Sequence, residues 1–170
     1  MSEIHWPGKY LPGTTDNYVS NEVIITGLTS AQVWPYLNDT TQWSTYYKNA
    51  SEIGFVNSAG PELAAGVRFR FTTFGLKVEA EVTEHVSPSE GNAARVSFRA
   101  WIAGGEQEDT STLHAWLLED LPGGRVRVLT QESQIGELAR QMAMMKPNPV
   151  LNAHQDWLEG LVQTAKKKKG

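Results

Sequence analysis

The chain has 170 residues, which is the size of one domain and too few for two ordinary ones. Its composition, with 40% hydrophobic and 20% charged residues, is typical of a globular protein and not of a disordered or fibrous one. The formal net charge of -4 argues against nucleic-acid binding, and the lack of cysteine excludes disulfides, thiolate metal sites and a cysteine nucleophile.

The first 16 residues show no periodic pattern and contain Pro7 and Pro12, so we expect an irregular N-terminal arm over residues 1–16. The sequence has neither the pattern of a secretory signal nor a run of 18 apolar residues. We therefore predict a cytoplasmic protein without stable membrane insertion.

The folded part is predicted to open with a strand and two short helices. Residues 18–28 are rich in valine and isoleucine, which favours a strand. Thr29 or Ser30 can cap the helix that follows, and Pro35 shortens or kinks this helix. A second short helix is expected over residues 39–43.

Six more extended segments complete a predicted sheet of seven strands. Apolar and polar residues alternate in them, as around Val78, Ala80 and Val82, which is typical of strands with one buried face. Turn residues separate most consecutive segments, so we expect an antiparallel meander. The segments cover residues 49–55, 67–73, 76–86, 94–102, 111–120 and 125–135.

The end of the chain changes to helical periodicity. Asn148 can cap a helix with Pro149 at its first position, and apolar residues then recur at helical spacing up to Ala165. We therefore predict one long amphipathic helix over residues 148–166, followed by a solvated basic tail over residues 167–170.

These elements predict a single α+β domain over residues 17–166. Its curved antiparallel sheet buries the concave face by wrapping around the long C-terminal helix, and the two short helices follow the first strand. One helix seldom fills such a face completely. We therefore expect an elongated, mostly apolar cavity that accepts a ligand of about 300 Å³ or more.

Four motifs occur in the order of this helix-grip arrangement. They are VWPYLNDTTQWSTYY after the first strand, GVRFRF at the third strand, LHAWLLEDLPGGRVRVLTQES in the last hairpin and DWLEGLV in the terminal helix. Over about residues 17–165 the chain thereby resembles the SRPBCC or START-like superfamily, which includes birch-pollen-allergen-like proteins and the polyketide cyclase/dehydrase and lipid transport group. The resemblance implies a small hydrophobic ligand such as a lipid, polyketide or aromatic metabolite.

The last hairpin brings a histidine and a glutamate together. If residues 122–124 form a three-residue loop, Leu121 pairs with Arg125, and His114 then lies opposite Glu132. Even-numbered residues should face the cavity, because the arginines of the second strand take odd positions. Such a pair can anchor a polar group of the ligand, transfer a proton, or form a purely structural contact.

Other side chains on the expected inner surfaces are candidates for contact with the ligand. Aromatic rings suit an apolar ligand, and those with a polar tip suit a lid at the cavity entrance. Packing in the core explains several of them equally well. Besides His114 and Glu132, the candidate ligand-binding residues are Trp43, Tyr47, Phe69, Phe71, Phe98, Trp116, Thr130, His154 and Trp157.

Three functions are compatible with the sequence. The first is a carrier or sensor of a small hydrophobic molecule, and the second is a polyketide cyclase or dehydratase that uses His114 and Glu132 as acid and base. The third is a protein interaction module or co-chaperone-like domain. No cofactor motif occurs and the four histidines lack metal-ligand spacing, so we expect neither a cofactor nor a metal. Homo-oligomerisation stays open.

Overall fold

One antiparallel sheet forms the body of the protein in the computed structural model, which describes residues 1–105 and 110–170. Its seven strands lie in the order β1-β7-β6-β5-β4-β3-β2, so neighbours in the sheet are consecutive in sequence except for β1 and β7. The strands are β1 (Asn17–Thr26), β2 (Ser51–Phe55), β3 (Arg68–Thr73), β4 (Leu76–Val86), β5 (Ala94–Ile102), β6 (Thr110–Leu121) and β7 (Arg125–Gly136).

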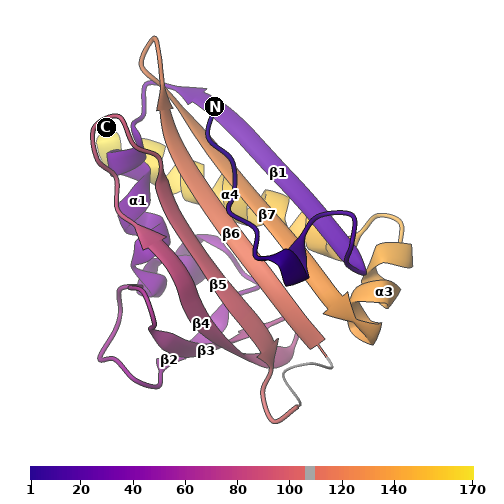
Figure 1. The fold of residues 1–170 in the computed structure, drawn as a ribbon. Helices are drawn as coiled ribbons and strands as arrows, with labels where there is room; N and C mark the ends of the chain where they lie inside the picture. The colour runs from indigo at the N-terminus through magenta and orange to yellow at the C-terminus, as the bar shows by residue number, and fades with distance from the viewer. Residues whose placement is uncertain (106–109) are drawn as a thin grey trace.

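The helices cover one face and one end of this sheet. Figure 1 shows α4 crossing behind the sheet, while α3 lies at the end where β7 finishes. The helices are α1 (Ser30–Asn38), α2 (Trp43–Tyr46), α3 (Glu137–Met144) and α4 (Pro149–Lys169), with short 3-10 turns η1 (Gly8–Tyr10) and η2 (Thr40–Gln42). The predicted α+β helix-grip architecture is therefore confirmed. No helix among the described residues is long and apolar enough to cross a membrane.

Two helix boundaries differ from those expected. The second short helix begins at Trp43, because the Asp39 side chain accepts a hydrogen bond from Thr41 N and first caps the 3-10 turn η2. Helix α4 starts with the predicted Asn148 cap but continues to Lys169, beyond the expected end. Lysine is a good helix former, and its charge is favourable near the negative end of the helix dipole.

The N-terminal arm crosses the outer face of the sheet over β6 and β7 (Figure 1). Ile4 in this arm is buried in a small apolar cluster with Ala115, Leu117 and Leu129. These odd-numbered strand residues were expected to face water. The arm covers them instead, so β6 and β7 are buried on both faces.

The register of the last hairpin agrees with the sequence analysis. Residues 122–124 form the loop, Leu121 pairs with Arg125, and His114 lies directly opposite Glu132. The twelve pairs between β6 and β7 continue without a bulge to the ends of both strands. The side chains at these two positions therefore share the concave face.

An aromatic cluster fills the part of the concave face next to α2. Trp43 is fully buried, and its ring centroid lies 5.0 Å from that of Trp157 and 5.9 Å from those of Phe69 and Phe71. The Nε1 atom of Trp43 donates a hydrogen bond to the Leu37 carbonyl oxygen at 2.8 Å. Since this polar atom is satisfied, the ring is a fixed part of the core.

Gly160 sets the distance between α4 and α2. A Cβ atom at this position would lie 2.5 Å from the Tyr46 carbonyl oxygen and 2.9 Å from Tyr46 Cδ2. Tyr46 is itself held, because its hydroxyl donates to the Tyr36 carbonyl oxygen at 2.9 Å. Any side chain at Gly160 must therefore push the two helices apart.

The exchange Gly160→Ala should lower the free energy of unfolding by about 2 kcal/mol, because overpacking against backbone outweighs the gain in helix propensity. Chemical denaturation measures this difference. The matched control is Gln163→Ala on the exposed side of the same helix, for which a change below about 0.5 kcal/mol is expected. Equal stability of the two variants would contradict the close approach at Gly160.

Candidate functional site

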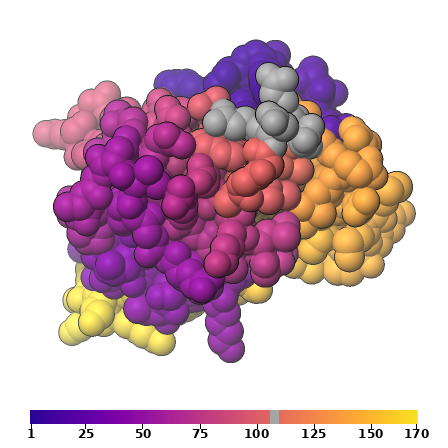
Figure 2. Space-filling view, turned by 90° about the horizontal axis from the view of Figure 1, so that it is seen from below, coloured from indigo at the N-terminus to yellow at the C-terminus, as the bar shows by residue number. Residues whose placement is uncertain are grey.

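A pocket of about 100 Å³ lies between the sheet, α3 and α4. Its outer end is bordered by the β3–β4 turn, the ends of β5 and β6, and α3. Phe74, Leu76 and Met142 are partly exposed there. Figure 2 views the protein from below and shows α3 (orange) beside the strand ends near residues 102 and 110. Among the described residues, this end of the pocket therefore lies at the protein surface.

The pocket is smaller than the 300 Å³ expected from the sequence. The difference arises because Trp43, Trp116 and Trp157 fill the inner part of the space between sheet and helix. An apolar cavity of about 150 Å³ in another protein accepts benzene. A volume of 100 Å³ with an open end thus suits a small ring or the end of a longer molecule.

The candidate residues from the sequence divide into two groups. Those that line the pocket are Tyr47, Phe71, Phe98, His114, Glu132, His154 and Trp157. Those that lie behind its wall are Trp43, Phe69, Trp116 and Thr130, all fully buried. Three of this second group pack in the aromatic core, and Thr130 hydrogen bonds to His114.

Several lining residues were absent from the candidates. Thr112 flanks the histidine on the same face, so strand alternation was a sufficient signal for it, while Gln134, which the hairpin register also directs towards the cavity, flanks the glutamate. Phe74 enters from the turn after β3 with φ of 51°, and Trp101 reaches the pocket from the end of β5. Neither of these positions follows from periodicity.

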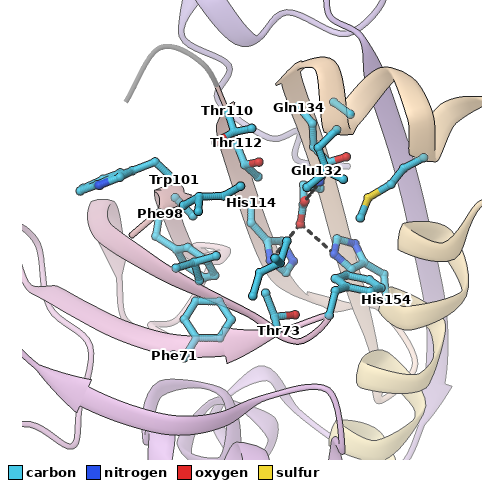
Figure 3. Close-up of a pocket in the computed structure, with 18 of the residues that line it drawn as sticks. Phe71, Thr73, Phe98, Trp101, Thr110, Thr112, His114, Glu132, Gln134 and His154 are labelled. Carbon is cyan, nitrogen blue, oxygen red and sulfur yellow. Dashed lines mark hydrogen bonds and ion pairs between the residues drawn. The ribbon is translucent and has the colours of Figure 1, made fainter. Parts of the chain in front are cut away.

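Three side chains from three elements meet at the pocket wall (Figure 3). Glu132 on β7 places Oε2 2.8 Å from Nε2 of His154 on α4 and 3.4 Å from Nδ1 of His114 on β6. The two imidazole rings are stacked, with centroids 4.3 Å apart and planes inclined by 11°. All three side chains are at least 90% buried. We call this group the His–Glu–His cluster.

Neighbouring polar groups hold two members of the cluster in place. His114 Nε2 is hydrogen bonded to Thr130 Oγ1 at 2.8 Å, and Gln134 Nε2 donates a hydrogen bond to Glu132 Oε1. His154 is different, because its buried Nδ1 has no hydrogen-bond partner among the described residues. His154 therefore has one polar contact among the described residues, that of Nε2 with Glu132, besides its stacking on His114.

Burial lowers the pKa of His114 well below the ordinary value for histidine, and the adjacent His154 lowers this pKa further. The His114 ring is accordingly neutral near pH 7 and carries one N–H. Burial also raises the pKa of the Tyr47 hydroxyl, which accepts a hydrogen bond from Asn49 Nδ2 at 3.0 Å. The Tyr47 hydroxyl is thus neutral near pH 7, and Tyr47 contributes an uncharged side chain to the pocket wall.

Fold and pocket together define a helix-grip protein with a buried His–Glu–His cluster beside a small, largely apolar pocket. The crystal structure of hypothetical protein jhp0584 from Helicobacter pylori superimposes with a TM-score of 0.90, at 44% sequence identity over 97% of each chain. The chain therefore belongs to the same family as this Helicobacter protein. No family model matches the chain, and no curated protein matches it.

More distant structures share the fold alone. Norcoclaurine synthase from Thalictrum flavum has a TM-score of 0.61 at 9% identity, over 91% of this chain and 96% of the synthase. DynU16, from the dynemicin biosynthetic locus, has a TM-score of 0.60 at 17% identity, over 89% of this chain and 48% of DynU16. At these identities the likeness extends to the fold only, and the superfamily expected from the sequence stays a prediction.

Thr130→Val should lower the free energy of unfolding by about 1 to 3 kcal/mol, because the buried Nε2 of His114 then loses its hydrogen-bond partner. Thermal and chemical denaturation measure the change. The same exchange at Thr112, which makes no side-chain hydrogen bond among the described residues, is the control and should stay within about 0.5 kcal/mol of the wild type. Similar losses in both variants would mean that the Thr130 contact does not stabilise the cluster.

Proposed function

We propose that this protein is a carrier or sensor that binds one small, largely apolar molecule in the pocket, with a polar group of that molecule at the His–Glu–His cluster. The observation that carries the proposal is the convergence of aromatic walls on a buried carboxyl group that contacts two imidazoles. A carboxylate is costly to bury, and a pocket that serves only as a packing defect has no need of one. Apolar walls with a few convergent polar groups are typical of small-molecule sites.

The walls favour a flat ligand. Phe71, Phe98 and Trp157 present rings to the pocket, and the Tyr47 ring stacks on Trp157 with centroids 4.5 Å apart. Such surfaces bind aromatic or unsaturated molecules through offset and edge contacts. The pocket volume limits the enclosed part to about one ring, so a longer lipid or polyketide would extend through the open end near Met142.

An enzymatic role is the second candidate. It is favoured by the contact of one carboxylate with two imidazoles beside a pocket, which is an arrangement that can move a proton to or from a bound molecule. Membership of the polyketide cyclase/dehydrase group would fit this role. The distinguishing observation is chemical change of a bound compound on incubation, which a carrier or sensor does not cause.

A protein interaction module is the third candidate. It would be favoured by a concave face filled completely with side chains. The inner part is filled by tryptophans, but the outer part is open, and this open part supports the first proposal over the third.

Filling the pocket tests the proposal. Phenol, indole and 1-naphthol are suitable small aromatic probes, and ligand-observed NMR can measure their binding. Ala100 lines the pocket on β5, so Ala100→Phe should occupy the space and weaken probe binding about 10-fold or more. Native mass spectrometry of the purified wild type should show any co-purified compound, which the variant should lack.

The control adds the same ring elsewhere on the sheet. Ile24 is 46% exposed on β1 and does not line the pocket, so Ile24→Phe should bind the probes like the wild type. Binding that is equal in all three proteins would show that the probes bind outside the pocket. Absence of binding to the wild type would contradict the carrier or sensor role.

A further inference from the structure

The His–Glu–His cluster has the donor atoms of a metal site. One possible ligand atom from each of His114, Glu132 and His154 lies within 4.8 Å of the other two, and all three residues are buried. Two imidazoles and one carboxylate are a ligand set of catalytic zinc sites and of non-haem iron(II) sites. The three residues are far apart in sequence, so the absence of a local spacing motif did not exclude this arrangement.

We propose that His114, Glu132 and His154 bind one divalent transition-metal ion, with Zn²⁺ as the best match, and that the open coordination positions of the ion face the pocket. This inference goes beyond small-molecule binding. A metal ion can bind in the absence of any apolar ligand, and the two properties are measured separately.

The distances around Glu132 support the site. Two ligand atoms bound at about 2.1 Å to one ion lie about 3.0 Å apart in an octahedral and about 3.4 Å apart in a tetrahedral arrangement. Glu132 Oε2 lies 2.8 Å from His154 Nε2 and 3.4 Å from His114 Nδ1. Both separations are close to those of neighbouring ligands, so Glu132 requires only a small shift.

Hydrogen bonds from neighbouring side chains orient two of the three metal ligands, His114 and Glu132. If His114 donates its Nε2–H to Thr130 Oγ1, the lone pair of Nδ1 is directed away from Thr130 and is available to an ion. Gln134 holds Oε1 of Glu132, which leaves Oε2 as the coordinating oxygen. Metal-binding histidines and carboxylates are commonly fixed by outer contacts of this kind.

The third ligand has to turn. Because the rings of His114 and His154 are nearly parallel, an ion cannot lie in both ring planes at once. The polar contact of His154 is to Glu132, and its Nδ1 has no partner among the described residues, so rotation of this ring breaks no other side-chain hydrogen bond. Metal binding should therefore separate the two stacked imidazole rings, while His114 keeps its hydrogen bond to Thr130.

Calorimetric titration of the metal-stripped 170-residue chain with Zn²⁺ tests the proposal, together with the visible absorption of the Co²⁺ form. One ion per chain is expected. Both His154→Ala and Glu132→Gln should weaken Zn²⁺ binding about 100-fold or more, because the first removes a ligand nitrogen and the second replaces an anionic carboxylate by a neutral amide. The control His5→Ala removes a histidine at the surface, where it contacts Glu84, and should leave binding unchanged.

Two results would overturn the metal site. One is the absence of saturable Zn²⁺ binding to the wild type. The other is Zn²⁺ binding by Glu132→Gln with wild-type affinity. Glu132→Gln preserves the size of the side chain, so this second result decides the question even if His154→Ala does not fold. Retention of small-molecule binding in either case would leave the proposed carrier or sensor role intact.

Discussion

The pairing of β6 with β7 is the constraint on which the rest of the structure depends. Twelve consecutive residue pairs run from the three-residue loop to the far end of both strands without a bulge. A shift by one residue would turn every side chain of one strand to the other face. The outer face would then carry His114 or Glu132, and the apolar residues under the N-terminal arm would enter the pocket. Core, pocket and cluster therefore follow from one register.

Burial of Glu132 is the main cost of this arrangement. The pocket wall offers this carboxyl group the imidazole of His154 and the amide of Gln134, and these groups replace part of its lost hydration. The compensation is incomplete on the side of His154, where one nitrogen has no partner among the described residues. A buried polar atom without a partner beside a pocket departs from a structural network, in which polar groups are usually satisfied throughout, and this supports the proposed binding role.

The sequence was sufficient for the fold and for the contact between two of the three cluster residues, because both depend on local rules. Alternation and turn residues predicted the sheet, Asn148 predicted the start of α4, and the loop over residues 122–124 predicted the contact of His114 with Glu132. The meeting of His154 with this pair depends on the rotation of α4 about its axis. Helical periodicity placed His154 on the inner side of α4, but the packing of this helix against α2 and the sheet, which includes the close contact at Gly160, decides which strand residues it meets.

The size of the pocket was overestimated for a related reason. Rotamers of large side chains decide how much of a concave face stays open, and Trp43 and Trp116 both turn into the space that the strand pattern left for a ligand. Their positions follow from tertiary packing with α2 and α4. The sequence could assign these residues to the inner surface, but it could not divide them between core and pocket.

The most direct test of ligand binding at the cluster is a titration of ¹⁵N-labelled protein with indole, followed through the imidazole nitrogen signals. Binding in the pocket predicts saturable shifts of the His114 and His154 signals, while those of His5 and His85, which lie outside the pocket, stay in place. Shifts confined to His5 and His85, or no shift of any histidine at saturating indole, would contradict a ligand site at the His–Glu–His cluster.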